Sequence, residues 1–549
     1  MAALFLIGFM ASGKTTVGRQ IASNTDRPFI DLDDAIAASS DVPVAELVKR
    51  DEPAFRRRET EELKRAIEFG DVVVATGGGC GANPANVELM RAAGTVIALG
   101  VDVPEAQRRA EGGPDRPLLA SADQLAKSRA SAYRMAHAAV STMGKSIADV
   151  VDEVVAIERI VTRAAPLSSG ASSSGASSSG ASSSGASSSL STASSSRSSS
   201  IASVVALGER SYPVEIVERF AELDVGSHVS DRSRVVVITD TNVSAHWSLP
   251  IPDVVEIAPG EASKSFETYA RVCNELVARG VDRGSAIVAV GGGVVGDLAG
   301  FVAATLFRGI PVVQVPTTIV AMCDAAIGGK TAIDIPAGKN LVGAFHQPRL
   351  VACALETLQT LPGRERRAGF GELWKYALLD GPELWRLVAS CAGWARDGGD
   401  AMPAAFREVM RRSIAYKAEV VGRDERELTG VRALLNLGHT VGHAIESASG
   451  MLHGEAVALG LIAAARVSSA VLGTRAELER ELIEALNASG LSVDIDRYLT
   501  DEVLARIDVD KKRVGKTLKY IAIRDVGDCE PVEIQVTELR RILRSNPSP

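Results

Sequence analysis

The chain has 549 residues, of which 46% are hydrophobic and 23% charged, and its formal net charge is −8. This length predicts several domains of about 150 residues each, and the apolar share excludes a wholly disordered, collagen-like or disulfide-scaffold protein. The acidic balance argues against a nucleic-acid binder. No stretch approaches the roughly 18 uninterrupted apolar residues of a membrane span, and the cysteines form no CxxC pair. We therefore expect a cytoplasmic protein with neither nucleic-acid nor membrane partners.

Residues 168–200 are almost entirely Ser, Gly and Ala. Such a segment cannot bury enough apolar surface to offset its ordering entropy. We predict a disordered linker at 167–202 that tethers a first folded part, residues 1–166, to a second part, residues 203–545.

The first part alternates short apolar runs with amphipathic stretches. This alternation predicts a parallel sheet with helices on both faces, the α/β class. The expected strands are 4–7, 28–31, 72–75 and 95–99, and the expected helices are 15–22, 52–69 and 122–138.

The second part changes character near residue 362. Residues 203–362 predict an α/β domain, and residues 363–545 an all-helical domain, with a site in the cleft between them. The expected strands are 235–239, 286–290 and 312–315, and the expected helices are 407–421, 440–448, 455–471 and 475–489.

The segment Gly8-Phe9-Met10-Ala11-Ser12-Gly13-Lys14-Thr15 fits the phosphate-binding pattern GxxxxGK[ST] between a predicted strand and a predicted helix. Backbone amides of such a loop turn toward phosphate oxygens, and the lysine reaches the terminal phosphates. The predicted nucleotide contacts are Ala11, Ser12, Gly13, Lys14, Thr15 and Thr16, with Thr15 also a Mg²⁺ ligand.

Two carboxylates, Asp31 and Asp33, follow at the end of the second expected strand. One can organise magnesium-bound water while the other contacts an acceptor hydroxyl, although a helix-capping role is the alternative for either. Further motifs complete the pattern: Phe55-Arg56-Arg57-Arg58-Glu59, Gly77-Gly78-Gly79, Arg116-Pro117-Leu118-Leu119 and Tyr133-Arg134.

On these motifs residues 1–165 closely resemble the shikimate kinase family. The resemblance implies ATP and Mg²⁺ as cofactors, and Lys14, Asp33 and Arg116 as catalytic residues, with Arg116 on a mobile lid. It places Asp31 near Mg²⁺. It assigns to shikimate Asp33, Arg56, the Gly78 backbone and Arg134, the two arginines gripping the carboxylate. A non-catalytic nucleotide-binding module that regulates its neighbour is the alternative.

In the second part, Gly291-Gly292-Gly293-Val294-Val295-Gly296-Asp297 follows an expected strand and opens an apolar helix. A glycine turn in this position permits close approach of a pyrophosphate, although such turns also occur without one. Asp240-Thr241-Asn242, after another expected strand, adds a candidate ribose-binding carboxylate.

Three of the seven histidines, His439, His443 and His453, fall within fifteen residues. His439 and His443 lie one helical turn apart on one face, and Glu372 can add a carboxylate. Two imidazoles and a carboxylate with an open position describe a catalytic Zn²⁺ site. A basic set predicts a phosphorylated, carboxylated substrate: Arg308, Lys330, Lys339, Lys375, Arg432, Lys511 and Lys512.

Together with FRGI, VPTT, GGKTAIDIPAGKNLVGAFHQP, LNLGHTVGHAIE and HGEAVALG, these stretches make residues 203–545 resemble 3-dehydroquinate synthases. The resemblance implies the metal ligands Glu372, His439 and His453 for Zn²⁺ or Co²⁺, with His443 facing substrate. It implies conversion of a heptulosonate phosphate to 3-dehydroquinate, in a homodimer formed through this half. Cys323-Asp324-Ala325-Ala326 and Trp374 depart from the family pattern and are expected to alter cleft packing.

The remaining roles follow from the same resemblance. The NAD⁺ contacts are Asp240, Asn242, Glu261, Lys264, Gly293, Val294, Val295, Gly296, Asp297, Thr317, Thr318, Lys330 and Lys339. The phosphate and substrate contacts are Lys330, Asn340, Lys375, Arg432, Asn436, Lys511 and Lys512, with Arg308 supplied by a neighbouring subunit. The catalytic set is Lys330, Lys375, Arg432, Asn436 and His443. A glycerol-dehydrogenase-like oxidoreductase is the alternative for this half.

Overall fold

The structure is a computed structural model that describes residues 2–40, 44–111, 122–163, 200–399, 401–507, 513–514 and 517–545. Arg116, Lys511, Lys512 and most of the predicted linker lie outside the described residues. The linker prediction is wrong at its end: Ile201 and Ala202 are buried in strand β6 (Ile201–Val205), because their apolar side chains pack inside the protein.

The first part is a five-stranded parallel sheet in the order β2-β3-β1-β4-β5, which confirms the predicted architecture. Its strands are β1 (Ala3–Gly8), β2 (Phe29–Asp31), β3 (Val73–Ala75), β4 (Gly94–Gly100) and β5 (Ala138–Ser141). Every residue of β1 is buried, as the central strand of a doubly covered sheet requires.

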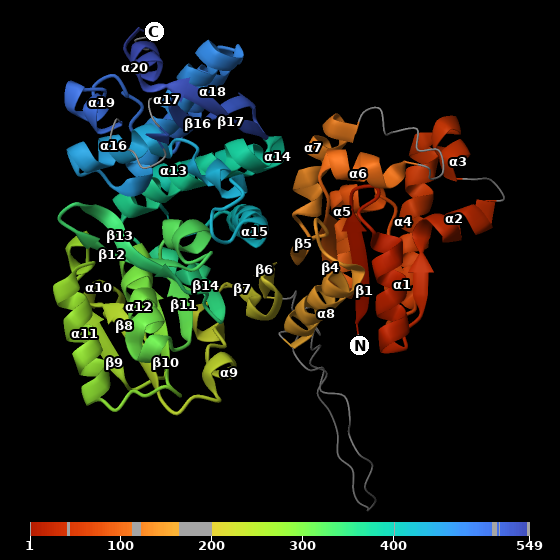
Figure 1. Cartoon of the computed structure of the whole chain (residues 1–549), viewed down its shortest axis with the longest axis horizontal. Helices are drawn as coiled ribbons and strands as arrows, with labels where there is room; N and C mark the ends of the chain where they lie inside the picture. The colour runs from red at the N-terminus through yellow and green to blue at the C-terminus, as the bar shows by residue number, and fades with distance from the viewer. Residues whose placement is uncertain are drawn as a thin grey trace, which may run out of the picture.

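Helices cover both faces of this sheet (Figure 1). They are α1 (Lys14–Thr25), α2 (Leu32–Ser40), α3 (Val44–Arg50), α4 (Glu52–Glu68), α5 (Pro84–Ala93), α6 (Val103–Ala110), α7 (Ala122–Tyr133) and α8 (Ile147–Arg163). The predicted helix 122–138 is too long. It ends at Tyr133 because the alanine-rich run that follows pairs with β4 as strand β5, so tertiary pairing overrides helix propensity.

The second part opens with a seven-stranded sheet in the order β6-β7-β14-β11-β10-β8-β9, parallel apart from the antiparallel β6–β7 pair. Its other strands are β7 (Tyr212–Val217), β8 (Val235–Asp240), β9 (Val254–Ile257), β10 (Ala286–Gly291), β11 (Val312–Pro316) and β14 (Leu350–Ala354). The hairpin β12 (Lys330–Ile335) and β13 (Gly338–Phe345) stands apart from it. The helices are α9 (Gly226–Val229), α10 (Thr241–Ser244), α11 (Phe266–Ala278) and α12 (Gly293–Thr305).

The last part is mainly helical, as predicted, but it is not all-helical. It contains α13 (Gly363–Asp380), α14 (Pro382–Asp397), α15 (Phe406–Arg423), α16 (His439–Ser449), α17 (His453–Leu472), α18 (Glu477–Ala488), α19 (Asp501–Ile507) and α20 (Val536–Ser545). A small antiparallel sheet joins β15 (Arg513–Val514), β16 (Thr517–Asp525) and β17 (Asp528–Gln535). The β16–β17 hairpin forms because its apolar residues pack into the helical core.

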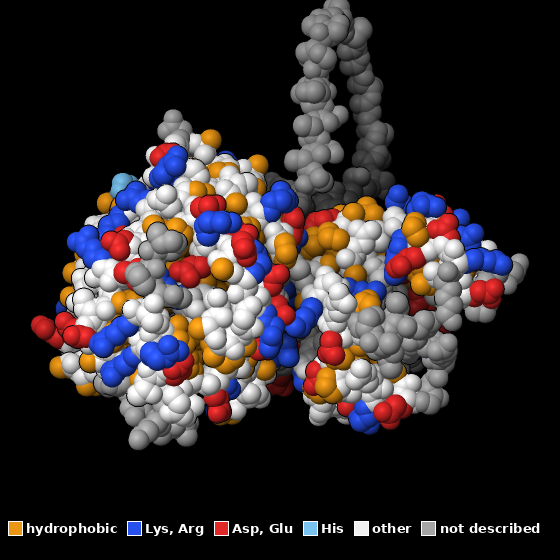
Figure 2. All heavy atoms as spheres, turned by 90° about the horizontal axis from the view of Figure 1, so that it is seen from above, with side chains coloured by type: hydrophobic (Ala, Val, Ile, Leu, Met, Phe, Trp, Pro, Cys, Tyr) orange, Lys and Arg blue, Asp and Glu red, His pale blue; other side chains and the backbone are white. Residues whose placement is uncertain are grey.

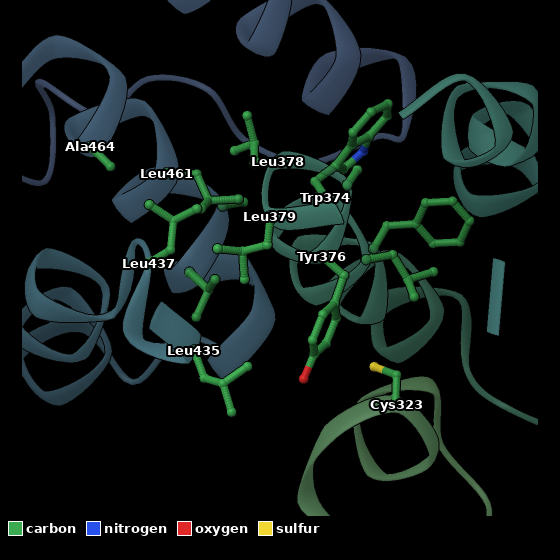
Figure 3. Close-up of a cluster of buried hydrophobic side chains, with 14 of the residues drawn as sticks. Cys323, Trp374, Tyr376, Leu378, Leu379, Leu435, Leu437, Leu461 and Ala464 are labelled. Carbon is green, nitrogen blue, oxygen red and sulfur yellow. The ribbon is translucent and has the colours of Figure 1, made fainter. Parts of the chain in front are cut away.

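The core of the helical domain surrounds α13 and α17. Figure 3 shows Leu379 of α13 pointing toward Leu437 and Leu461, while Tyr376 points toward the segment that carries Cys323. By length and composition α17 resembles a membrane span, but 72% of its apolar window is buried, as in a core helix of a globular domain.

The two folded parts pack against each other (Figures 1 and 2). Ile201 and Val204 of β6 belong to the same apolar cluster as Val140 and Ile157 of the first part. The amide of Val204 donates to the carbonyl of His137 over 2.6 Å. The two folded parts therefore share an interface.

Candidate active sites

The phosphate-binding loop runs from the end of β1 to the start of α1. Gly8 has φ 138°, and a Cβ atom there would lie 2.4 Å from the Leu99 carbonyl oxygen, so only glycine fits. Gly13, at φ 93°, is the N-cap residue that precedes α1. Lys14 Nζ donates to the carbonyls of Gly8 (3.1 Å) and Phe9 (2.9 Å), folding back over the loop. This is a helix N-terminus shaped for an anion.

Other predicted nucleotide contacts share this loop. Ala11 has the left-handed φ of 57°, and Thr16 is exposed in the first turn of α1. The buried Ser12 hydroxyl has no hydrogen-bond partner among the described residues. A buried hydroxyl without a partner is costly, which fits a loop completed by a phosphate.

Oxygen atoms suited to Mg²⁺ lie beside the loop. Thr15 Oγ1 donates to Asp31 Oδ2 over 2.7 Å, and Asp31 Oδ1 accepts from the Asp33 amide over 3.1 Å. Hydroxyl and carboxylate oxygens are the ligands that Mg²⁺ prefers. The donor set therefore fits that ion.

Three consecutive glycines, Gly77, Gly78 and Gly79, lie beside the side chains predicted to bind shikimate. A Cβ atom on Gly77 would lie 2.5 Å from Asp33 Oδ1, and one on Gly79 would lie 1.7 Å from Arg56 Nη1. Burial and the charge of Asp31 raise the pKa of Asp33, against the opposing effect of Lys14 and Arg56. A carboxylate and a guanidinium therefore both border this run of glycines.

The second arginine beside these glycines is Arg129, not the predicted Arg134. A Cβ atom on Gly78 would lie 3.3 Å from Arg129 Nη1, and the Tyr133 hydroxyl donates to the Gly78 carbonyl over 2.7 Å. Arg134 Nε instead donates to Asp380 Oδ1 over 2.6 Å, and its guanidinium lies 4.9 Å from the Tyr416 ring centre. Arg129 and Tyr133, four residues apart, share a face of α7 that Arg134 does not; this spacing was the available sequence signal.

The glycine turn of the second part lies between β10 and α12. Gly292 is the N-cap residue of α12, and the Thr317 amide donates to the Gly291 carbonyl over 3.0 Å. A Cβ atom on Gly292 would lie 3.1 Å from the Thr318 side chain. A small cavity here is lined by Gly291, Gly292, Gly293, Gly296, Asp297, Gln314, Pro316, Ala321, Ala325 and Ala326.

Two of the predicted dinucleotide contacts have structural tasks of their own. The side chain of Val295 packs into the apolar core instead of the cavity. Asp240 accepts from the amides of Asn242 (2.9 Å) and Val243 (3.0 Å) and so caps α10. The capping role does not require a ligand.

Lys264 joins the glycine turn to the β12–β13 hairpin. Its buried Nζ donates to Asp297 Oδ2 over 2.9 Å and to Asn340 Oδ1, and it lies 3.4 Å from Glu261. Burial lowers the pKa of Lys264, but Asp297 and Glu261 reverse this effect and raise it. Lys264 therefore stays charged.

A cluster of one carboxylate and three imidazoles occupies the helical domain. His439 and His453 begin α16 and α17, and their Nε2 atoms lie 3.5 Å and 3.1 Å from Glu372 Oε1 of α13. The ligand atoms of the three imidazoles, His439, His443 and His453, lie within 4.8 Å of one another. The structure thus brings together every predicted metal ligand and also His443.

Glycine contacts let these helices approach so closely. A Cβ atom on Gly371 would lie 2.0 Å from the Gly454 carbonyl oxygen, so α13 and α17 touch through their backbones. Glu372 directly follows Gly371, and His453 directly precedes Gly454. Their side chains therefore lie in contact. His439 Nδ1 lies 3.0 Å from the Leu437 carbonyl and His453 Nδ1 lies 3.0 Å from Glu446 Oε2, which turns each Nε2 toward Glu372.

The cluster is strongly charged although it is buried. Burial alone would raise the pKa of Glu372, but Lys375, whose Nζ lies 2.6 Å from Oε2, and His439 hold it well below its usual range. Burial opposes, but the bonds to Glu372 and Glu446 raise, the pKa of His453 to about 10. A proton on His453 is therefore held next to a carboxylate, and a bound divalent cation would displace it.

Sequence reasoning missed two residues of this site. Asp324, in the π-helical turn Ala321–Ala325, accepts from the Tyr376 hydroxyl and lies 3.4 Å from Lys375 Nζ. Lys417 Nζ lies 2.8 Å from the same carboxylate, and burial lowers its pKa to about 8. Asp324 belonged to a segment noted only for packing, and Lys417 lies in mid-helix without a motif, although π-turns often mark functional sites.

The remaining predicted contacts border the cluster. Arg432 is buried and donates to the Glu425 carbonyl over 2.6 Å, and Asn436 ends the turn that precedes His439. Lys330 pairs with Glu427, and Lys339 pairs with Glu446 over 2.7 Å. Arg308 lies apart, in an exposed turn.

Fold and sites together define the class of the protein. A phosphate-binding loop at the edge of a parallel sheet is typical of a kinase-type nucleotide-binding enzyme. A glycine-turn α/β domain joined to a helical domain with a carboxylate–imidazole cluster is typical of a dinucleotide- and metal-dependent enzyme. The chain combines both.

Family models agree with this division. Residues 10–158 match shikimate kinase, residues 254–368 match the N-terminal domain of 3-dehydroquinate synthase, and residues 369–513 match its C-terminal domain. The chain belongs to the 3-dehydroquinate synthase family and carries a shikimate kinase domain ahead of it. It is thus an enzyme with both activities.

Individual relatives support the assignment of the second part. The 3-dehydroquinate synthase of Caulobacter vibrioides is 43% identical over 347 residues, which is 59% of this chain and 92% of the relative. That of Xylella fastidiosa is 44% identical over 335 residues, 57% of this chain and 84% of the relative. The synthase reading is therefore supported over the glycerol-dehydrogenase-like alternative.

Solved structures agree on the fold. 2-Deoxy-scyllo-inosose synthase, in complex with carbaglucose-6-phosphate, NAD⁺ and Co²⁺, is 26% identical with a TM-score of 0.54, covering 62% of this chain and 98% of that one. 2-Epi-5-epi-valiolone synthase from Streptomyces hygroscopicus, with NAD⁺ and Zn²⁺, is 26% identical with a TM-score of 0.51, covering 60% and 95%.

Proposed function

We propose that the kinase half phosphorylates shikimate to shikimate 3-phosphate with Lys14 and Asp33 as its central residues. Phosphoryl transfer requires mainly alignment and charge neutralisation. Lys14 would bind the terminal phosphates of ATP. Asp33, whose pKa is raised by burial and Asp31, would orient the acceptor hydroxyl and take up its proton. Arg116 remains a sequence prediction, outside the described residues.

Thr15 and Asp31 would hold Mg²⁺ beside the loop, supported by the 2.7 Å contact between their oxygens. When bound, the ion would neutralise phosphate charge. Arg56 and Arg129 would bind the shikimate carboxylate, since both guanidinium groups lie beside the run Gly77–Gly79. Arg134 would not bind the carboxylate, because its guanidinium donates to Asp380 of the synthase half.

The synthase half, on our proposal, converts 3-deoxy-D-arabino-heptulosonate 7-phosphate to 3-dehydroquinate and phosphate. Glu372, His439 and His453 would hold Zn²⁺ or Co²⁺, and the glycine turn with Asp297, Thr317 and Thr318 would hold NAD⁺. When bound, NAD⁺ would supply reversible hydride transfer with the carbon that bears a substrate hydroxyl, and the metal would polarise that hydroxyl.

The chain's own residues then bind and shield the substrate. Lys375, Lys417 and Arg432 supply buried positive charge near the cluster, suited to a carboxylate and to hydroxyls that gain negative charge. Lys330 and Asn340 of the hairpin would bind the phosphate. Lys417, with its pKa lowered to about 8, can exchange a proton at Nζ near neutral pH.

The single observation that carries the synthase proposal is a fully buried carboxylate, Glu372, that faces two imidazoles through one oxygen. The test is to supply the purified chain with heptulosonate phosphate, NAD⁺ and Zn²⁺. We expect phosphate release without net NADH, together with ADP formation that requires shikimate in a separate assay. NADH that accumulates in step with turnover would instead support a dehydrogenase.

A homodimer through the synthase half is part of the proposal. It is supported by the exposed turn at Phe307 and Arg308, which have the strained left-handed φ values of 53° and 69°. In a dimer Arg308 would reach the partner's substrate. Two variants inactive alone, Arg308→Ala and Glu372→Gln, should restore some phosphate release when mixed. We place the protein in the cytoplasm, since its six cysteines are all unpaired thiols.

A further inference from the structure

Helix α7 of the kinase half has two working faces. One face carries Arg129 and Tyr133, which lie over Gly78 in the pocket assigned above to shikimate. The opposite side carries Lys127 and Ser131 and leads to Arg134, and all three contact the synthase half. One short helix therefore joins the kinase pocket to the other domain.

Asp380 is the centre of this contact. It is the last residue of α13, and its side chain is only 1% exposed. Oδ1 accepts from Arg134 Nε over 2.6 Å, and Oδ2 accepts from the Ser131 hydroxyl over 3.1 Å. The backbone carbonyl of Asp380 also accepts from Arg134 Nη2, over 3.1 Å.

Because of its position, the charge of Asp380 requires cationic partners. A buried carboxylate at the C-terminal, negative end of a helix is unfavourable unless cations compensate it. Arg134 is one compensating cation. Arg412 of α15 is the other, with Nη1 3.7 Å from Oδ2 and 3.0 Å from the Ser131 hydroxyl that it donates to. The negative charge of Asp380 in the synthase half is thus compensated in part by Arg134, the residue that follows α7.

We propose that Asp380 of the synthase half is a positioning residue for the shikimate pocket of the kinase half. By holding Ser131 and Arg134, it fixes α7 so that Arg129 and Tyr133 stay over Gly78. Asp380 itself does not touch the substrate. The inference rests on the proposed function, because it takes Arg129 as a shikimate contact.

The test is kinase kinetics on the full chain carrying Asp380→Asn, which keeps the shape and removes the charge. We expect the KM for shikimate to rise about tenfold while kcat and the KM for ATP stay within twofold. Arg134→Gln, on the other side of the same contact, should raise the KM for shikimate equally. The double variant should be little worse than either single one, because both single variants remove the ion pair between Asp380 and Arg134.

The matched control is Asp528→Asn, which removes the exposed Lys127–Asp528 pair on the same helix; such pairs contribute little, so the KM should stay within twofold. Phosphate release by the synthase half of each preparation reports folding. Should Asp380→Asn not fold, Arg134→Gln carries the test alone.

A KM for shikimate that is unchanged in the variants, or a KM for ATP that rises equally, overturns the inference. Arg129→Gln separates the two possible failures. A normal KM for shikimate in Arg129→Gln overturns the proposed shikimate contact and the inference with it. A raised KM in Arg129→Gln beside a normal one in Asp380→Asn overturns the inference alone.

Discussion

The two active sites organise charge in opposite ways. In the kinase half, Lys14 donates to backbone carbonyls of its own loop, and burial, together with the charge of Asp31, raises the pKa of Asp33. In the synthase half, Glu372 and Lys375 are fully buried and lie 2.6 Å apart. The first site is a shaped loop, whereas the second is an ion-pair network already assembled within the helices. Removing one charged side chain should therefore leave the fold of the kinase site intact, whereas it should disturb the structure of the synthase site.

The largest effect is expected from Glu372→Gln. Losing this carboxylate removes the group that faces both imidazoles and leaves Lys375 without one of its partners. We predict a loss of synthase activity on the order of 1,000-fold, about 4 kcal/mol, with kinase activity within twofold.

Glu365→Gln is the matched control for that variant, since Glu365 is exposed in the first turn of the same helix. Phosphate release and the amount of bound metal are measured for both Glu372→Gln and Glu365→Gln. Full synthase activity with bound metal in Glu372→Gln would remove Glu372 from the centre of the site.

Lys14→Met tests the loop site. The phosphates would lose their lysine, and we predict a fall in shikimate-dependent ADP formation of roughly 1,000-fold. The unfolding temperature should change little, because Lys14 is only half-buried and lies in the loop, outside the apolar core. Lys64→Met, exposed on α4, is the control. A kinase rate near wild type would contradict the loop assignment.

Glu215→Gln tests how a buried carboxylate without a cationic partner among the residues that the structure describes changes the free energy of unfolding with pH. Burial and Asp224 raise the pKa of Glu215 in β7 to about 7, from an ordinary 4.5. The protonated form is therefore favoured in the folded protein. Its contribution to the free energy of unfolding is complete below about pH 4.5 and is lost as the pH rises to 7, by about 3 kcal/mol.

Chemical unfolding between pH 4.5 and 7.5 measures that slope. Glu215→Gln should flatten it, whereas Glu256→Gln, exposed on β9, should retain it. An identical slope in Glu215→Gln would show that this carboxyl does not titrate there.

The smallest effect is expected from Glu446→Gln, which alters a group behind the metal cluster. Glu446 accepts from His453 Nδ1 at 3.0 Å and pairs with Lys339. Weakening this support should reduce metal affinity 10–100-fold without removing a ligand. Competition with a coloured chelator measures it, with Glu484→Gln as control because Glu484 is exposed on α18, away from the cluster. Unchanged affinity would mean that His453 needs no such orientation.

The same contrast explains what sequence reasoning could reach. The phosphate loop is contiguous, so Gly13, Lys14 and Thr15 were predicted together with their strand and helix. The ligands Glu372, His439 and His453 came from family resemblance, because helical spacing alone favoured His443 as the partner of His439. Lys417 had no local signal at all, since only tertiary packing brings α15 to Asp324.

Two misassignments have one physical origin, the contact between the halves. The local motif Tyr133-Arg134 predicts a substrate contact at Arg134, but the partner of Arg134, Asp380, lies 246 residues away. Ile201 directly follows the serine-rich segment, and its apolar neighbours include residues of the kinase half. Local sequence patterns predict strands and the faces of helices. They contain little information about interfaces between domains.

The most direct measurement is a crystal structure of the zinc-loaded chain with anomalous scattering at the zinc edge. We predict a single strong peak per chain, coordinated by Glu372 Oε1 and by the Nε2 atoms of His439 and His453. A peak bound elsewhere, or one from which Glu372 is turned away while it pairs only with Lys375, would contradict the proposed centre of the synthase site.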